Sequence, residues 1–173
     1  ERSIISTKKK ILEKCGTIDI LINNASITAF KSFIDTKPPE FDDIIETNLR
    51  GGYLMARTVL PIMMKKKRGH IINILSVAAH TVFTNSSAYA ASKAGMLAMF
   101  NGLRAEVRKF NIKISNIMPG ATDTPMWSPA VRQKSANRMM TPREVADITY
   151  AVASQPKKVV IEDVVIKPIK GDL

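Results

Sequence analysis

The alternation of strand-like and helix-like stretches constrains the fold more than any other feature of this 173-residue chain. Short runs rich in Ile and Val predict strands, and longer stretches with apolar residues three or four positions apart predict helices. Helices of this length can serve as crossovers, so the order predicts an α/β domain with a parallel sheet that is covered on both faces. The expected strands are residues 18–23, 69–76, 112–117 and 159–166, and the expected helices are residues 4–14, 39–64, 86–110 and 142–154, with Gly51-Gly52 as the place where the second helix could break.

Polar and small residues follow three of the predicted strands. Asn23-Asn24-Ala25-Ser26 follows the first strand, Ser76 ends the second, and Pro119-Gly120 follows the third. Ligands bind outside the carboxyl ends of the strands in open α/β sheets, so we expect these residues to meet at one ligand site. The loop over residues 120–141 has roughly 20 residues, where connections commonly have about 4–6, which is typical of a lid, a binding loop or a disordered segment.

Tyr89 and Lys93 stand four residues apart in Tyr-Ala-Ala-Ser-Lys, so both side chains lie on one face of the predicted helix. A nearby ammonium favours the phenolate form of a tyrosine, and a tyrosine with a lowered pKa can exchange a proton with an alcohol or a carbonyl oxygen. Such a pair, taken alone, is more often two surface neighbours. Ser76, at the end of a strand earlier in the chain, favours the catalytic interpretation.

In this order, these residues resemble the motifs of the short-chain dehydrogenase/reductase family. Asn23-Asn24-Ala25-Ser26 resembles its Asn-Asn-Ala-Gly motif, and residues 119–124, Pro-Gly-Ala-Thr-Asp-Thr, resemble its Pro-Gly segment. Five motifs in the family's order cover nearly the whole chain and argue strongly against chance. The residues that match the family's catalytic asparagine, serine, tyrosine and lysine are Asn48, Ser76, Tyr89 and Lys93.

The resemblance implies an NAD(P)-dependent enzyme that interconverts an alcohol and a carbonyl by hydride transfer. It implies that Ser76 hydrogen-bonds the substrate oxygen, that Tyr89 is the general acid and base, and that Lys93 lowers the tyrosine pKa and binds the nicotinamide ribose. Asn48 would hold a water of the proton relay. The residues implied in cofactor binding are Asn23, Ala25, Tyr89, Lys93, Pro119, Gly120, Thr122 and Thr124.

The family's fold is a Rossmann-like, doubly wound parallel sheet, of which this chain would supply the C-terminal portion, about four strands with flanking helices. The implied cofactor is NAD or NADP. NADP is slightly favoured because residues 159–168 are similar to a branch that acts on 3-hydroxy acids and similar small alcohols, often with NADP. The implied partners are a small alcohol or carbonyl substrate and further copies of the chain, in a homodimer or homotetramer built on the helices that carry Asn48 and Tyr89.

The sequence departs from the family in its first part, where no Gly-rich phosphate-binding motif occurs and the chain begins with Glu1. We therefore expect residues 1–173 to be a single incomplete domain without the first strands, about 70 residues by analogy. The strand at residues 18–23 would then have an open apolar edge, so we expect the chain alone to aggregate and neither to bind the cofactor well nor to turn over. Ser26 replaces the motif glycine, and His80 stands where a glycine often follows the serine.

Composition excludes several other classes of protein. Lys and Arg number 26 against 15 Asp and Glu, a formal charge of +11, but they occur in small groups at expected helix ends without interleaved aromatic residues, which disfavours a nucleic-acid interface. The single cysteine, Cys15, excludes an internal disulfide, and with only two histidines, His70 and His80, no metal site is expected. No apolar run approaches the length of a membrane span, so we expect a cytoplasmic protein without a nucleic-acid or membrane partner.

Two other hypotheses stay open. A catalytically inactive, truncated paralogue could act as an interaction or oligomerisation module through its two long helices, although the retained catalytic set argues against it. Binding of nucleic acid through the basic surface would depend steeply on salt concentration.

Overall fold

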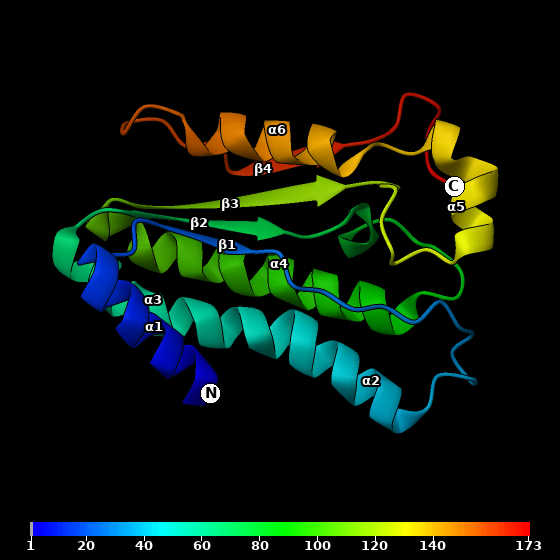
Figure 1. The fold of residues 1–173 in the computed structure, drawn as a ribbon, viewed down its shortest axis with the longest axis horizontal. Coiled ribbons are helices and arrows are strands. Elements are labelled where there is room, and N and C mark those ends of the chain that lie inside the picture. The colour runs from blue at the N-terminus through cyan, green and yellow to red at the C-terminus, as the bar shows by residue number, and fades with distance from the viewer. Residues whose placement is uncertain (1) are drawn as a thin grey trace.

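The computed structural model describes residues 2–173 and contains a parallel sheet with the strand order β1-β2-β3-β4 (Figure 1). Each strand lies beside the one that precedes it along the chain. The predicted α/β class with a parallel, Rossmann-like sheet is confirmed, although the last strand is shorter than predicted and the third is longer. The strands are β1 (Ile20–Asn23), β2 (Gly69–Ile74), β3 (Ile112–Pro119) and β4 (Asp163–Ile166).

The α-helices of residues 2–173 are α1 (Arg2–Cys15), α2 (Pro38–Ile45), α3 (Gly51–Lys66), α4 (Ser87–Val107), α5 (Pro129–Ser135) and α6 (Pro142–Ala153). In Figure 1, α3 and α4 lie on one face of the sheet, and α6 lies on the other. Ile71 of β2 packs into the core shared with α3 and α4, whereas the next residue, Ile72, packs against Val152 of α6. Adjacent strand residues point to opposite faces, so the continuous isoleucine run of β2 serves both cores.

One turn of π-helix, Glu46–Arg50, joins α2 to α3. The second predicted helix therefore changes its geometry just before Gly51-Gly52 and does not break there. Gly52 is explained by packing, because a Cβ at this position would lie 2.9 Å from Met96 Cε of α4. π turns inside helices are frequent at functional sites, and this one carries Asn48.

The segment after β3 is more structured than its length suggests. It contains α5 and a 3-10 turn, Ala136–Arg138. The Ser128 hydroxyl caps α5 by accepting a hydrogen bond from the Val131 backbone N–H at 3.3 Å, and Pro129 occupies the first helical position. A bridge between Thr122 and Met140 closes the base of this segment. The expected lid is therefore a compact unit and not a disordered loop.

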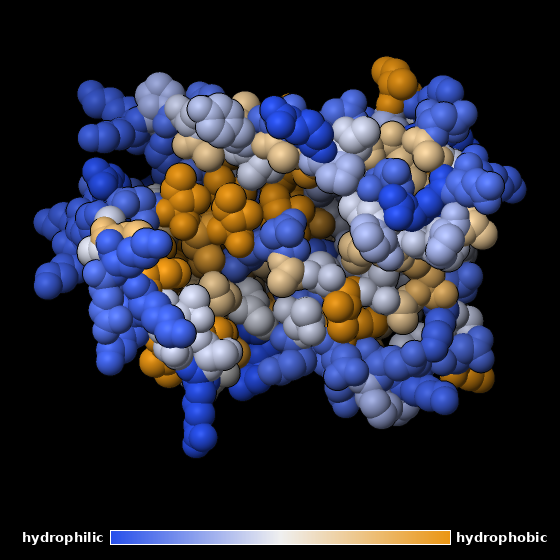
Figure 2. All heavy atoms as spheres, in the orientation of Figure 1, coloured by the Kyte–Doolittle hydropathy of each residue, from blue (hydrophilic) through white to orange (hydrophobic). Residues whose placement is uncertain are grey.

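β1 is the open edge of the sheet. Within residues 2–173, it pairs with β2 alone. Leu21 points into the core, whereas Ile20 and Ile22 point to the face that α6 partly covers and are 47% and 50% exposed. Figure 2 shows apolar side chains gathered on this face of the molecule. The expected open apolar edge is present, and the expected helical cover of both sheet faces is incomplete over β1.

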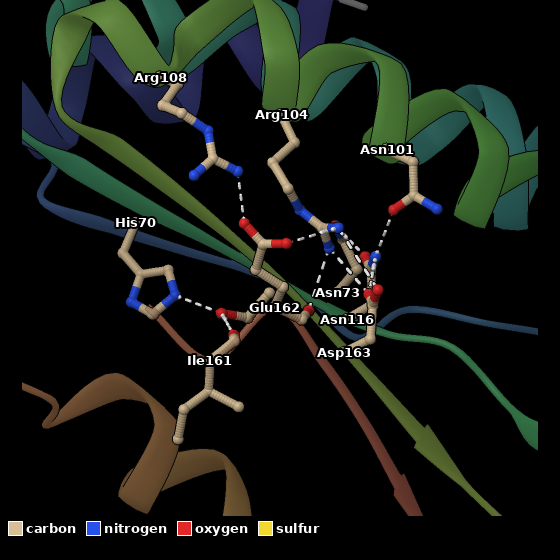
Figure 3. A network of polar contacts seen from close by, with 10 residues as sticks. His70, Asn73, Asn101, Arg104, Arg108, Asn116, Ile161, Glu162 and Asp163 are labelled. Carbon is tan, nitrogen blue, oxygen red and sulfur yellow. Dashed lines mark hydrogen bonds and ion pairs between the residues drawn. The ribbon is translucent and has the colours of Figure 1, made fainter. Parts of the chain in front are cut away.

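A row of polar side chains crosses the buried interior of the sheet. Asn23 of β1 donates to Asn73 of β2, and Asn73 donates to Asn116 of β3, each over 2.9 Å. Asn116 donates to the Asp163 carboxylate of β4 over 2.8 Å, and Arg104 of α4 pairs with the same carboxylate (Figure 3). These strand residues are direct neighbours in the sheet register. The row therefore satisfies amides in a place that water does not reach.

His70 belongs to a second buried contact between strands. Its Nε2 lies 2.8 Å from Ser115 Oγ, and this hydroxyl donates to the Ile161 carbonyl at 2.5 Å (Figure 3). Because the serine proton is used there, His70 Nε2–H is the donor in their contact. Burial, helped by the Lys113 cation, lowers the pKa of His70 to about 4, so this histidine is neutral at physiological pH and has a structural role.

Candidate active site

A cavity of about 370 Å³ opens at the carboxyl ends of the strands. The segments that follow β1, β2 and β3 form its walls together with the first turns of α4. This is the meeting point that the topology predicts for an open α/β sheet. Its polar wall includes Asn24, Ser26, Ser76, Tyr89, Lys93, Gly120, Thr122 and Thr124.

Lys93 is almost completely buried at the floor of this cavity, with 2% of its surface exposed. Its Nζ donates to the Ile74 carbonyl at 3.0 Å and lies over the Tyr89 ring, 5.5 Å from the ring centroid. Burial lowers the pKa of Lys93 to about 8, because the interior disfavours the charged form. The predicted face shared by Tyr89 and Lys93 is present.

The Tyr89 hydroxyl lies among serine hydroxyls. Burial raises the pKa of this phenol, and the side chains of Ser76 and Ser26 oppose that rise by hydrogen bonding. Ser76 follows β2 directly, and its Oγ accepts a hydrogen bond from the Ala78 backbone N–H at 3.1 Å. This contact caps a short 3-10 turn and holds the serine against the start of α4. The two serines oppose the effect of burial on the pKa of the tyrosine.

Asn48 holds the backbone of the site instead of lining the cavity. Its Oδ1 accepts from the Ile27 N–H at 2.8 Å, and its Nδ2 donates to the Ile27 carbonyl at 2.9 Å. The same Nδ2 donates to Ser92 Oγ at 3.0 Å, and this hydroxyl donates to the Tyr89 carbonyl at 2.7 Å. Asn48, which is 1% exposed, thereby ties the loop after β1 to the helix that carries Tyr89 and Lys93.

The expected cofactor residues fall into two groups. Gly120, Thr122 and Thr124 line the cavity with Pro119, and Thr122 Oγ1 donates to the Gly120 carbonyl at 3.1 Å. Asn23 instead turns into the sheet, where it donates to Asn73. The lining contains its neighbours Asn24 and Ser26, and neither Asn23 nor Ala25 is part of it. Side chains alternate between two directions along an extended segment, and this alternation could have separated Asn24 and Ser26 from Asn23 and Ala25 in the sequence.

Aromatic side chains close the outer wall of the cavity. Phe30, from the loop after β1, stacks on Trp127 with ring centroids 4.9 Å apart and planes at 14°. The indole Nε1–H of Trp127 donates to the Thr122 carbonyl at 3.0 Å, which fixes the ring over the cavity. Met126 and Phe83 add to this wall. Met126 and Trp127 belong to the long loop that the sequence singled out, whereas Phe30 and Phe83 lie far from it in the sequence and were not predicted.

Metal sites and membrane spans are two other kinds of feature. Within residues 2–173, no group of three or more His, Cys, Asp or Glu side chains could hold a metal ion. Over the same residues, no helix combines the length and apolar character needed to span a membrane. His80 and Cys15 are exposed.

Comparison with known proteins gives one consistent family. The family described as short chain dehydrogenase matches residues 1–135. Sepiapterin reductase of Chlorobaculum tepidum is 35% identical over 163 residues, which are 94% of this chain and 66% of that protein. An uncharacterized oxidoreductase of Staphylococcus saprophyticus is 30% identical over 161 residues, 93% of this chain and 68% of that protein. The chain thus spans about two thirds of the length of these relatives.

Solved structures agree with this comparison. A metagenomic short-chain oxidoreductase in complex with NADP is 30% identical, has a TM-score of 0.81 and is matched over 96% of this chain and 69% of its own. A protein named ElxO, with NADP bound, is 25% identical, has a TM-score of 0.86 and is matched over 95% of this chain and 72% of its own.

Proposed function

The chain belongs to the short-chain dehydrogenase family of oxidoreductases, and from this premise we propose that its cavity is the site of an NADP-dependent interconversion of an alcohol and a carbonyl. One observation carries the proposal: Ser76, Tyr89 and Lys93 line the same cavity at the carboxyl end of the sheet. A buried lysine and a phenol among hydroxyls are a combination suited to proton transfer.

In this proposal, Tyr89 gives its hydroxyl proton to the carbonyl oxygen during reduction and takes it back during oxidation. Ser76 donates a hydrogen bond to the same substrate oxygen and stabilises the charge that develops there. Asn48 positions the loop and the helix, since its amide contacts Ile27 and Ser92. Both Nδ2 hydrogens of Asn48 are used in contacts with Ile27 and Ser92, so its side chain has no donor left for the water of the expected proton relay.

The chain's residues also fit a dinucleotide at this cavity. Lys93 Nζ carries three donors, of which one goes to the Ile74 carbonyl, so the ammonium can also donate to ribose hydroxyls. Gly120, Thr122 and Thr124 offer backbone and hydroxyl groups to a carboxamide on the opposite wall. When bound, the nicotinamide would supply or accept the hydride. NADP is favoured over NAD because two solved relatives are described with NADP bound.

The aromatic and thioether wall favours an apolar carbonyl substrate, since Phe30, Phe83 and Trp127 offer no charge to pair with a carboxylate.

We also propose that residues 1–173 form one incomplete Rossmann-like unit, in which another strand continues the sheet beside β1. The open edge of the sheet and the exposed Ile20 and Ile22 support this. Exposed Phe41 and Tyr53 on α2 and α3 support a homo-oligomer, and the single thiol is compatible with the cytoplasm.

The test combines cofactor binding with turnover. Trp127 is the single tryptophan of the chain and lines the cavity, so its fluorescence reports NADPH binding directly. Once the sheet is continued beside β1, we expect NADPH to quench it and the protein to oxidise NADPH with an apolar ketone, whereas residues 1–173 alone should do neither. Tyr89→Phe should keep the quenching and lower turnover by about 100-fold or more. Tyr150→Phe, at a side chain that is 75% exposed, is the matched control and should change neither readout.

Unchanged turnover in Tyr89→Phe would refute the proposed role of the tyrosine. Absence of both quenching and turnover in residues 1–173 alone would agree with an incomplete cofactor site. NADPH binding without turnover of any carbonyl compound would favour the alternative of a catalytically inactive paralogue that serves as an interaction module.

A further inference from the structure

The buried hydroxyl of Ser26 is a feature that packing alone does not explain. Its Oγ is shielded from water and makes no hydrogen bond of ordinary geometry among the described residues. A buried polar atom without a partner costs free energy, so its presence calls for an explanation in function. Ser26 lines the cavity together with Ser76 and Tyr89.

The segment that carries Ser26 is held in place on its far side. The amide of Asn48 hydrogen-bonds both the N–H and the carbonyl of the next residue, Ile27. The same amide is tied through Ser92 to the backbone of Tyr89. The buried side chain of Asn48 therefore fixes the backbone beside Ser26 relative to Tyr89.

Two serines line the cavity together with Tyr89. Ser76 comes from the end of β2 and Ser26 from the segment after β1. Both hydroxyls favour the ionised phenol and oppose the effect of burial on the pKa of Tyr89. Lys93 Nζ lies over the face of the Tyr89 ring and is therefore not placed as a donor to the phenol oxygen.

We propose that Ser26 is a second serine partner of the Tyr89 oxygen, and that its hydroxyl rotates to donate to this oxygen when the phenol has lost its proton. This proposal rests on the proposed proton transfer by Tyr89. The phenolate oxygen is a stronger acceptor than the oxygen of the protonated phenol, so this hydrogen bond forms fully only when the proton has left.

The experiment is a titration of Tyr89 that needs neither cofactor nor turnover. Tyrosinate absorbance is followed against pH in the protein, and the same titration of Tyr89→Phe is subtracted to remove Tyr53 and Tyr150. We expect Ser26→Ala to raise the pKa of Tyr89 by about one unit, a tenfold change in its acid constant. Ser26→Thr keeps a hydroxyl and should restore the original value.

Thr28→Val is the matched control. The Thr28 hydroxyl is also buried without a partner, on the other side of Ile27, but it does not line the cavity. We expect it to leave the Tyr89 titration unchanged. If Ser26→Ala does not fold, Ser26→Gly makes the same test.

A Tyr89 titration that Ser26→Ala or Ser26→Gly moves no further than Thr28→Val overturns the proposal. An upward shift that Ser26→Thr does not reverse also overturns it, because the effect would then come from packing and not from the hydroxyl. The two proposals fail separately. A shifted titration in a protein that binds NADPH but turns over no carbonyl compound would uphold the role of Ser26 and refute the enzymatic function. If Tyr89 is essential for turnover but its titration does not change in the Ser26 variants, the enzymatic function is upheld and the role of Ser26 is refuted.

Discussion

Replacement of Asn73 by leucine tests whether the asparagine row stabilises the sheet. Asn73 is fully buried and makes two hydrogen bonds of 2.9 Å, one as acceptor from Asn23 and one as donor to Asn116. Leucine has a similar size but can make neither bond. The change would leave an amide donor of Asn23 and the carbonyl oxygen of Asn116 without these partners in the interior.

The magnitude follows from these two orphaned groups. Each buried, unsatisfied polar group costs about 1–3 kcal/mol. The apolar surface of the leucine returns part of this loss. We therefore expect the free energy of unfolding to fall by about 3 kcal/mol, at the upper end of what single substitutions commonly cost. With a urea dependence of about 2 kcal/mol per molar, the midpoint of unfolding should move down by about 1.5 M.

The assay is urea unfolding followed by circular dichroism, with Asn101→Ala as the matched control. Asn101 is exposed and accepts from the same Asn116 amide at 3.1 Å, but this amide also donates to Asp163. The control should cost less than about 1 kcal/mol, since no buried group loses its last partner. If Asn73→Leu moves the midpoint no more than Asn101→Ala, the buried row does not stabilise the sheet and the reasoning is wrong.

Two further predictions concern stability. Burial and the Lys113 cation lower the pKa of His70 from 6.5 to about 4, so the unfolded chain takes up this proton at a higher pH than the folded chain. The free energy of unfolding should therefore fall by about 3 kcal/mol as the pH drops from 6.5 to 4. Unfolding experiments at several pH values should show that His70→Gln removes this dependence. A Cβ at Gly69 would clash with the inner part of the Met63 side chain, whereas one at Gly102 on the exposed side of α4 meets no atom within 4 Å. Gly69→Ala should therefore lower the melting temperature and Gly102→Ala should raise it, by about 1–3 and about 1 kcal/mol in free energy; equal effects would contradict the packing argument.

Periodicity and strand-end chemistry predicted most of the fold from the sequence. The four strands and the helices that connect them follow from local patterns, and the convergence of Ser76, Tyr89 and Lys93 follows from topology. The start of α5 could also have been predicted, because Ser128-Pro129 is a helix-start signal. The interpretation of residues 120–141 instead rested on the length of the loop.

The remaining features depend on contacts between distant segments. The π turn at Glu46–Arg50 and α2 both contact α4, and no local pattern in the sequence predicts this turn. The orientation of Asn48 toward Ile27 depends on a loop that starts more than twenty residues earlier. The stacking of Phe30 on Trp127 likewise joins two loops that only the folded sheet brings together.

The π turn also has a consequence for how this helix pair tolerates changes in length. Ile44, Asn48, Gly52 and Ala56 are buried at steps of four residues. In a regular α-helix, each such step overshoots a full turn by about 40°, so the buried stripe would wind away from α4. The wider turn absorbs that overshoot and keeps the stripe straight. Three regular turns span about 11 residues, so removal of one residue between Ile44 and Ala56 would let a regular α-helix keep the same buried stripe. We therefore expect this joint to tolerate a deletion better than an insertion.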